Sequence, residues 1–162
     1  QALAPFRRAM PSRPEGDPEP LPYLADPADR ESGGLGIELE VTILSQKMRA
    51  ADEPPHILSR GEAAAAMYWS AAQIVTHHAS NGCNLQPGDL IGTGTLSTDQ
   101  ATGLGSLLEI SKGGQEPIEL PNGEKRSFLE DGDQLTLSAR CHAEGAASIG
   151  FGSCTGRVTA AR

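Results

Sequence analysis

The stretch from Gly36 to Lys47 places the strongest constraint on how this chain can fold. Four apolar residues, Ile37, Leu39, Val41 and Ile43, alternate there with polar ones. Successive side chains of a strand point to opposite faces, so a period of two indicates a β-strand with one face buried. The segment therefore predicts a half-buried strand whose other face meets water.

Two carboxylates lie on the polar face of this predicted strand. Glu38 and Glu40 are two residues apart, so their side chains share one face. Paired carboxylates can ligate a cation, but more often they form the wet face of an antiparallel strand. The pattern favours the wet face and leaves the cation as an alternative.

Glycine and proline interrupt the chain 19 and 12 times, which predicts many turns between short elements. Apolar or alternating runs between these turns predict further strands at residues 90–96, 105–111, 118–120, 126–129 and 134–142, and from 149 onward. Pro121-Asn122-Gly123 predicts a hairpin turn. The expected fold class is α+β and β-rich, with curved mixed sheets forming a β-roll or barrel-like domain around one main helix.

One segment has the pattern of a helix. Ser59 and Glu62 form an S-x-x-E capping pattern, and an alanine-rich run follows. We expect a helix from about residue 60 to residue 78. It should stop at Asn81-Gly82, because glycine readily adopts the left-handed conformation that ends helices.

His77 and His78 fall in the last turn of this predicted helix. A functional interpretation makes them a general base or a metal ligand. The alternative is that the helix dipole stabilises both, or that one is a core histidine with a single partner. Adjacent helical residues point about 100° apart, so the two cannot easily bind one metal. The sequence favours the structural alternative.

A net charge of −8 argues against nucleic acid or anionic lipid as a partner, because both attract clusters of lysine and arginine. No apolar run approaches the roughly 20 residues of a membrane span, and no secretory signal is apparent. Cys83, Cys141 and Cys154 are an odd number without C-x-x-C spacing. They predict reduced, mostly buried thiols in a cytoplasmic protein.

We expect residues 1–162 to belong to a single domain. Residues 1–34 are rich in proline and should be extended, with Leu21-Pro22-Tyr23-Leu24 apolar enough to pack on the rest of the protein. A disordered linker is the alternative at 13–20 and 25–34. Because the first residue is not methionine, we expect a piece of a longer protein.

Polar groups stand out between residues 88 and 110. Thr93 and Thr95 alternate with glycines at the end of one predicted strand, and Glu109 lies between apolar residues of the next. Hydroxyls beside glycines can bind a ligand that approaches the backbone. Glu109 could orient a histidine, act as a base on water or help to hold a cation. The alternative is ordinary strand residues beside a carboxylate on a wet face.

Several blocks of this sequence resemble the C-terminal part of the fumarylacetoacetase (fumarylacetoacetate hydrolase) family, in the family's order. They are Leu21-Pro22-Tyr23-Leu24, Met67-Tyr68-Trp69-Ser70, Thr76-His77-His78 with Asn81-Gly82-Cys83-Asn84-Leu85, Pro87-Gly88-Asp89, Gly94-Thr95, Gly105-Ser106 with Leu108-Glu109, Phe128-Leu129 with Asp131-Gly132-Asp133, and Ile149-Gly150-Phe151-Gly152 with Cys154. The block from Thr76 to Leu85 is particular to fumarylacetoacetase, whereas the Pro-Gly-Asp and Gly-Thr elements are shared by the wider superfamily.

The resemblance implies a hydrolase that cleaves a carbon–carbon bond of fumarylacetoacetate, a small diketo acid, to give fumarate and acetoacetate in tyrosine and phenylalanine catabolism. In the family a divalent cation, Ca²⁺ or Mg²⁺, holds the diketone oxygens, and a histidine oriented by a glutamate activates water. Glu109 falls on the position of that catalytic glutamate. Thr95 falls on the threonine that hydrogen-bonds the substrate carboxylate.

The resemblance also places the family's catalytic histidine, metal ligands and basic residues upstream of this chain. It therefore implies no metal ligand within these residues, an inactive isolated fragment and, in the complete enzyme, a homodimer. Two alternatives stay open. One is a non-catalytic β-rich binding module, because these residues hold no complete catalytic set. The other is a different superfamily activity, such as acylpyruvate hydrolysis or oxaloacetate decarboxylation.

Overall fold

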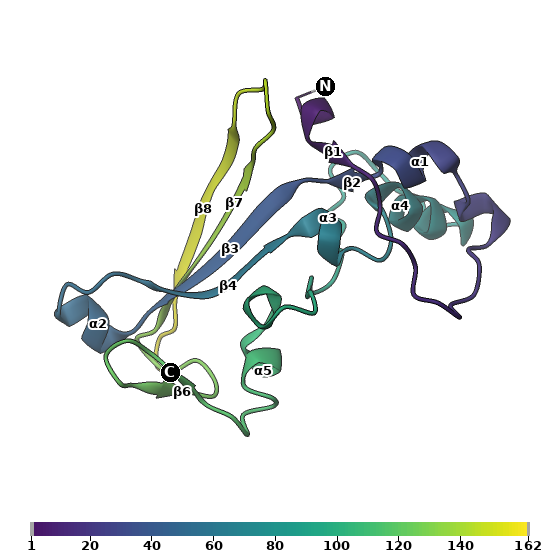
Figure 1. The fold of residues 1–162 in the computed structure, drawn as a ribbon. Helices are drawn as coiled ribbons and strands as arrows, with labels where there is room; N and C mark the ends of the chain where they lie inside the picture. Colours follow the sequence, from purple (N-terminus) through teal and green to yellow (C-terminus); the bar gives the residue numbers. More distant parts are fainter. Residues whose placement is uncertain (1, 162) are drawn as a thin grey trace.

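A four-stranded antiparallel sheet is the largest element of the protein (Figure 1). A computed structural model describes residues 2–161. The sheet has the order β4-β3-β7-β8, with β3 at Ile37–Leu44, β4 at His56–Glu62, β7 at Gln134–Cys141 and β8 at Ile149–Arg157. Two smaller antiparallel pairs join β1 (Arg7–Arg8) to β2 (Gly34–Leu35) and β5 (Ile118–Glu119) to β6 (Lys125–Arg126).

The helices are short. They are α1 (Pro27–Ser32), α2 (Gln46–Ala50), α3 (Ala63–Ala66), α4 (Ala71–Ser80) and α5 (Leu107–Ile110), with 3-10 turns η1 (Ala4–Phe6), η2 (Pro22–Leu24) and η3 (Ala101–Gly103). In Figure 1, α1 and α4 lie with the N-terminal segment at one end of the molecule, and α2 lies with β6 at the other. Among the described helices, none has the length and apolar character needed to cross a membrane.

The α+β, β-rich fold class is confirmed, but two of its details are wrong. Every strand pairing in the described part of the chain is antiparallel, so the sheets are not mixed. The main sheet also does not close into a barrel within residues 2–161, because β4 and β8 are both edge strands. Closure needs the two edge strands to pair with each other, and among the described residues β4 and β8 do not pair.

The alternating segment forms a strand as predicted, and it is one of the two inner strands of the main sheet. The predicted burial of one face is wrong for most of its length, because Ile43 is buried while the other residues of the strand, apolar and polar alike, are partly exposed.

The two carboxylates of this strand meet arginines of both neighbouring strands. Arg140 donates to Glu38 across an Nε–Oε2 distance of 2.7 Å, and Arg60 donates to Glu40. The hydrogen bond to Glu38 raises the pKa of Arg140. Glu38 and Glu40 therefore belong to cross-strand ion pairs. Each exposed pair contributes little to the stability of the fold, because water screens the charges.

The predicted helix from residue 60 to 78 is wrong at its start and is broken in its middle. Residues 60–62 belong to β4, Ala63–Ala66 form the short helix α3, and Ala71–Ser80 form α4. In β4, Ser59 pairs with Val41 and Glu62 pairs with Glu38. The alanines themselves are helical in α3, and the misplaced part is the segment before them, which pairs with β3. The helix starts again after Ser70, whose hydroxyl accepts from the Gln73 amide at 3.0 Å in a reciprocal capping box.

The predicted strands at 90–96 and 105–111 are also wrong. Residues 90–96 are extended loop, and Leu90 is 99% exposed. Residues 107–110 form α5. β-Branched and apolar residues form a strand only beside a partner strand, and no described strand pairs with 90–96.

The other predicted elements are confirmed with different bounds, except that the predicted strand at 126–129 is reduced to β6 at Lys125–Arg126 and residues 127–129 lie outside any strand. The hairpin around Pro121-Asn122-Gly123 is β5–β6, and residues 134–142 and 149 onward are β7 and β8. Helix α4 ends as predicted at Asn81, followed by Gly82 at φ +86°. The thiol prediction is wrong for Cys83 and Cys154, which are exposed. Cys141 is buried, and burial raises the pKa of its thiol.

The proline-rich segment is held against α4 and is not a linker. Leu24 is buried, and its carbonyl accepts from the Gln73 side chain at 2.9 Å. The disordered-linker alternative is wrong at 25–34, where α1 begins after Asp26. The Asp26 carboxylate accepts from the Ala28 amide at 2.9 Å and caps this helix.

A small core fills the corner between the end of β3, helix α2 and the β5–β6 hairpin. Ile43, Met48 and Leu120 are buried there, and Leu58 and Leu135 pack against them. Burying side chains of this size stabilises the fold by about 1.5–3 kcal/mol each. The core therefore joins the hairpin to the main sheet.

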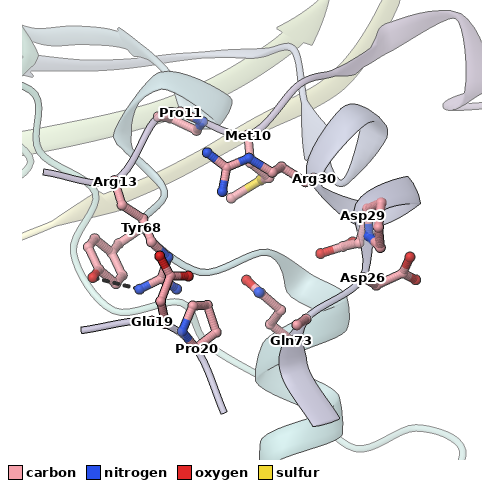
Figure 2. Close-up of a pocket in the computed structure, with 12 residues that line it drawn as sticks. Met10, Pro11, Arg13, Glu19, Pro20, Asp26, Asp29, Arg30, Tyr68 and Gln73 are labelled. Atoms are coloured by element: carbon pink, nitrogen blue, oxygen red, sulfur yellow. Dashed lines mark hydrogen bonds between the residues drawn. The ribbon is translucent and has the colours of Figure 1, made fainter. Parts of the chain in front are cut away.

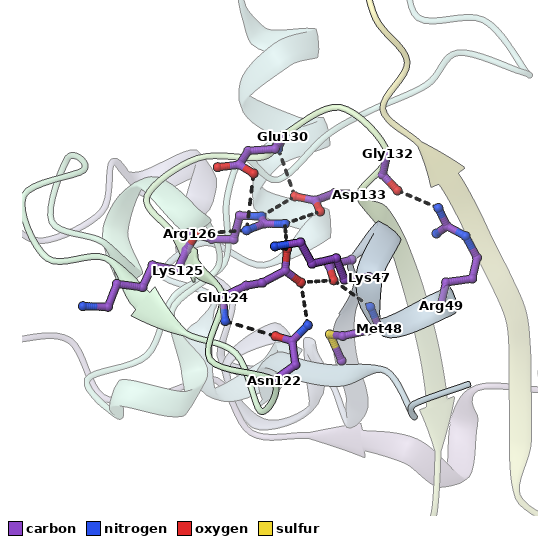
Figure 3. A network of polar contacts seen from close by, with 11 residues as sticks. Lys47, Met48, Arg49, Asn122, Glu124, Lys125, Arg126, Glu130, Gly132 and Asp133 are labelled. Carbon is purple, nitrogen blue, oxygen red and sulfur yellow. Dashed lines mark hydrogen bonds and ion pairs between the residues drawn. The ribbon is translucent and has the colours of Figure 1, made fainter. Parts of the chain in front are cut away.

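A network of charges lies beside this core (Figure 3). The Arg126 guanidinium donates to both oxygens of Asp133 at 2.8 and 3.0 Å, and both residues are buried. Arg126 also donates to Glu124 at 3.2 Å. Glu124 in turn accepts from Ser45, the N-cap of α2, and from Asn122 at 2.6 Å. The network links the hairpin, the start of α2 and the start of β7.

These contacts predict acid-sensitive stability. The Ser45 hydroxyl, followed by Asn122 and Arg126, lowers the pKa of Glu124 from 4.5 to about 2. A carboxyl with a lowered folded-state pKa stabilises the fold above its unfolded-state pKa, and this contribution is lost as the pH falls from about 4.5 to 2. The test compares the free energy of unfolding in urea at pH 7 and at pH 3. Between these pH values, the free energy of unfolding of Glu124→Gln should fall by about 2 kcal/mol less than that of the wild type.

Glu116→Gln is the matched control, because Glu116 is exposed in an i,i+4 pair with Lys112. It should reproduce the wild-type pH dependence. An equal loss in wild type and Glu124→Gln would contradict the assigned role of Glu124.

Candidate functional site

The chain after Pro87-Gly88-Asp89 turns back on itself and packs on the main sheet. The Thr98 amide donates to the Gly103 carbonyl at 3.0 Å, and the Gly103 amide donates to the Gln100 carbonyl at 2.8 Å. The turn η3 formed in this way contacts β4. The loop therefore has a fixed place on the sheet.

Glu109 lies at one end of this loop, and two serine hydroxyls hold its carboxylate. Ser97 Oγ is 2.8 Å from Oε1 and 3.0 Å from Oε2, and Ser106 Oγ is 2.8 Å from Oε2. Hydrogen bonds from Ser106 and Ser97 lower the pKa of Glu109. The side chain is exposed, on a helix and not in an apolar strand. The site thus offers a fixed, ionised carboxylate to a group that approaches from outside.

Thr95 lies against the same cluster. A Cβ atom built on Gly105 would stand 2.6 Å from Thr95 Cγ2 and would also overlap the Leu96 carbonyl. Only a residue without a side chain lets the two ends of the loop approach so closely. The structure therefore brings the segment of Thr95 to the segment of Glu109, which the sequence separates by a polar loop.

Thr93 does not share this arrangement. Its hydroxyl donates to the Gly94 carbonyl at 2.9 Å. Gly94 itself has φ +78°, a backbone conformation that favours glycine. The contact of Thr93 is thus local to the extended loop, and a structural role is the better interpretation.

A hollow of about 430 Å³ opens between this loop and the end of β4. Its lining is mostly polar and includes Arg60, Glu62, Ser97, Thr98, Asp99 and Gln100. Ser97 lines the hollow and also contacts Glu109, whereas Glu109, Ser106 and Thr95 are not among the lining residues. Ser97 therefore connects the hollow to the carboxylate. Hydroxyl, carboxylate and guanidinium groups suit a small polar ligand.

His77 of α4 contacts the proline-rich segment. His77 stacks on Tyr23 with ring centroids 6.4 Å apart and planes 7° from parallel, and the Tyr23 hydroxyl lies 2.9 Å from its Nδ1. This agrees with a histidine that has one partner, although the ring is exposed and not in a core. Its contacts hold the proline-rich segment to α4.

A second hollow lies between the proline-rich segment and α4 (Figure 2). The Arg13 guanidinium lies over the rings of Tyr68 and Trp69, 4.6 and 4.2 Å from their centroids, and donates to the Tyr68 hydroxyl at 2.7 Å. That hydroxyl donates to Asp17 at 2.6 Å, which raises the pKa of Tyr68. These polar groups contact one another and hold the segment in place.

Within residues 2–161, no group of three or more histidine, cysteine, aspartate or glutamate side chains is arranged to hold a metal ion. Glu38 and Glu40 contact arginines, and Glu109 contacts serines. The described residues therefore do not fit a complete cation site.

Sequence reasoning missed Ser97 and Ser106 as partners of Glu109. A signal for Ser106 is present, because Ser106-Leu107-Leu108-Glu109 has the S-x-x-E capping pattern. In the structure Ser106 is the N-cap of α5 and accepts from the Glu109 amide at 3.3 Å. Ser97 is twelve residues from Glu109 and lacks such a signal, since only the folded loop brings it close.

The close approach at Gly105 gives a testable prediction. Gly105→Ala should push the ends of the loop apart, because the added methyl overlaps backbone at Leu96. We expect a loss of about 1–3 kcal/mol in the free energy of unfolding and a higher pKa of Glu109 as Ser97 moves away. Urea unfolding and NMR titration of ¹³C-labelled glutamate would measure both.

Gly150→Ala is the matched control, because a Cβ at this position of β8 meets open space. The assigned packing is contradicted if the two variants have the same stability and the same Glu109 titration.

Comparison with known proteins adds a family relationship to this geometry. Residues 27–159 match the family described as "Fumarylacetoacetate (FAA) hydrolase C-terminal". Fumarylacetoacetase of Arabidopsis thaliana is 43% identical over 157 residues, which are 97% of this chain and 34% of that protein. Fumarylacetoacetase of Homo sapiens is 41% identical over 157 residues, 97% of this chain and 35% of the relative. This chain thus spans about a third of the length of the curated relatives it matches.

Proposed function

Because the chain belongs to the fumarylacetoacetate hydrolase C-terminal family, we propose that it is part of an enzyme that hydrolyses fumarylacetoacetate to fumarate and acetoacetate. The observation that carries the proposal is the pair of hydroxyls that hold the Glu109 carboxylate, one of which also lines a polar hollow. The relatives named fumarylacetoacetase align over nearly the whole chain. Water would add to the carbonyl carbon of the broken bond, and the other carbon would take a proton.

Glu109 is the proposed catalytic carboxylate. Its exposed side chain can accept a hydrogen bond from the imidazole N–H of a histidine supplied by the longer polypeptide. An ionised carboxylate in that position fixes the tautomer of the ring and stabilises the imidazolium that forms when the other nitrogen takes a proton from water. As an exposed glutamate, Glu109 is ionised at neutral pH, and the hydrogen bonds from Ser106 and Ser97 lower its pKa further.

Thr95 is the proposed substrate-binding residue. Its side chain is exposed, and its methyl group lies against Gly105 near the Glu109 cluster. The hydroxyl can donate a hydrogen bond to a substrate carboxylate. Glu109 and Thr95 would then act on the same bound molecule, one through a histidine and one directly.

The finer features of the complete enzyme are part of the same proposal. We propose that it acts in tyrosine and phenylalanine catabolism in the cytoplasm as a homodimer. A divalent cation, Ca²⁺ or Mg²⁺, would bind through residues outside this chain. The described residues do not form a complete cation site, and the proposed roles of Glu109 and Thr95 do not act through the cation.

Replacing the proposed catalytic residue tests the proposal. In the full-length protein, Glu109→Gln should lower kcat on fumarylacetoacetate by on the order of 10²–10⁴-fold and leave the melting temperature nearly unchanged. The amide keeps the shape of the side chain but cannot stabilise an imidazolium. Glu116→Gln, also an exposed glutamate, serves as the control. Wild-type turnover by Glu109→Gln would refute the assigned role.

The substrate-binding role predicts a different kinetic signature. Thr95→Val keeps the shape of the side chain but removes the hydroxyl, so the hydrogen bond to the substrate carboxylate is lost. We expect kcat/KM to fall roughly tenfold, mainly through a higher KM. Thr155→Val, which alters an exposed threonine of β8, is the control. An unchanged KM in Thr95→Val would contradict the role.

The choice of substrate separates the alternatives. The full-length wild type should consume fumarylacetoacetate faster than acylpyruvates or oxaloacetate. Faster turnover of an acylpyruvate, or decarboxylation of oxaloacetate, would assign another superfamily reaction. Absence of turnover on all three would favour a non-catalytic binding module.

A further inference from the structure

We propose that Ser97 is a positioning residue that turns the Glu109 carboxylate so that Oε1 faces the incoming histidine. This inference rests on the proposed function of Glu109. It adds two features to that function. One is Ser97, which is twelve residues from Glu109 in the sequence, and the other is a specific orientation of the Glu109 carboxylate.

The two oxygens of Glu109 have different surroundings. Both serine hydroxyls contact Oε2, Ser106 at 2.8 Å and Ser97 at 3.0 Å. Among the side-chain hydroxyls of residues 2–161, Ser97 alone contacts Oε1, at 2.8 Å. A carboxylate oxygen has two acceptor positions, so Oε1 keeps one for a further donor. The asymmetry therefore selects Oε1 as the oxygen that receives an imidazole N–H.

Ser97 is itself held in a fixed orientation. The Gly105 amide donates to Ser97 Oγ at 3.0 Å, so this oxygen is already an acceptor and its own proton is left to donate to Glu109. The neighbouring Thr98 amide donates to the Gly103 carbonyl and closes the loop. A hydroxyl fixed in this way restricts the rotation of the carboxylate.

The place of Ser97 also couples the two proposed site residues. It lies two residues after Thr95 and lines the polar hollow, while its hydroxyl contacts Glu109. Ser106 contacts Glu109 as well, but it caps α5 from within the same helix. Changing Ser106 would disturb the helix and the carboxylate together, whereas changing Ser97 acts on the carboxylate from across the loop.

The test uses Ser97→Ala and Ser97→Thr in the full-length enzyme. Ser97→Ala should lower kcat on fumarylacetoacetate about tenfold to a hundredfold, with KM within about twofold of the wild type. It should also raise the pKa of Glu109 in ¹³C-glutamate NMR, assigned by difference from Glu109→Gln. Ser97→Thr keeps the hydroxyl and should recover both the rate and the titration. Ser153→Ala on the exposed strand β8 is the matched control and should change neither.

Two results would overturn the positioning role. One is a Ser97→Ala variant with wild-type kcat and an unchanged Glu109 titration while Glu109→Gln is inactive. The other is a loss of kcat in Ser97→Ala that Ser97→Thr fails to recover, with the Glu109 titration unchanged. Wild-type turnover by Glu109→Gln has a different meaning, because it removes the proposed role of Glu109 itself.

Discussion

The buried ion pair between Arg126 and Asp133 is the interaction on which the arrangement of the chain depends. Both side chains are almost wholly inaccessible, and the guanidinium meets both carboxylate oxygens. Losing one member of such a pair costs about 3–5 kcal/mol, because the other charge stays buried without a partner. Through Glu124 and Ser45 the pair also fixes the start of α2. One charge network therefore sets the position of the hairpin relative to both inner strands.

The main sheet supports the loop of the candidate site. Strand β4 pairs with β3, and η3 packs on β4, so the loop that holds Ser97 rests on the edge of the sheet. Reactive groups on a loop above a fixed scaffold are a common division of labour in proteins. Here β4 supports the loop that contains Ser97, and the Ser97 hydroxyl donates to the Glu109 carboxylate. The carboxylate can then be both exposed and well oriented, as its proposed role requires.

One four-residue pattern had two different outcomes in this chain. Ser59 and Glu62 have the same S-x-x-E spacing as Ser106 and Glu109. The first pair lies in a strand because β3 offers it a partner, whereas the second caps a helix. A capping pattern contributes only about 1 kcal/mol, so the neighbours available in space decide whether it is used. This is why the predicted helix began too early. It is also why the same pattern at Ser106 did not by itself identify this serine as a partner of Glu109.

The sequence by itself determined the elements whose pattern is local: the alternating strand at Ile37–Leu44, the hairpin at Pro121-Asn122-Gly123 and the end of α4 at Asn81. It also singled out Glu109, since a charged residue between apolar ones stands out in any strand or helix. Only the tertiary structure decided which groups contact that carboxylate. Ser97 reaches Glu109 because the loop closes and Gly105 lets its ends approach, and contacts across a folded loop have no periodicity that a sequence can display.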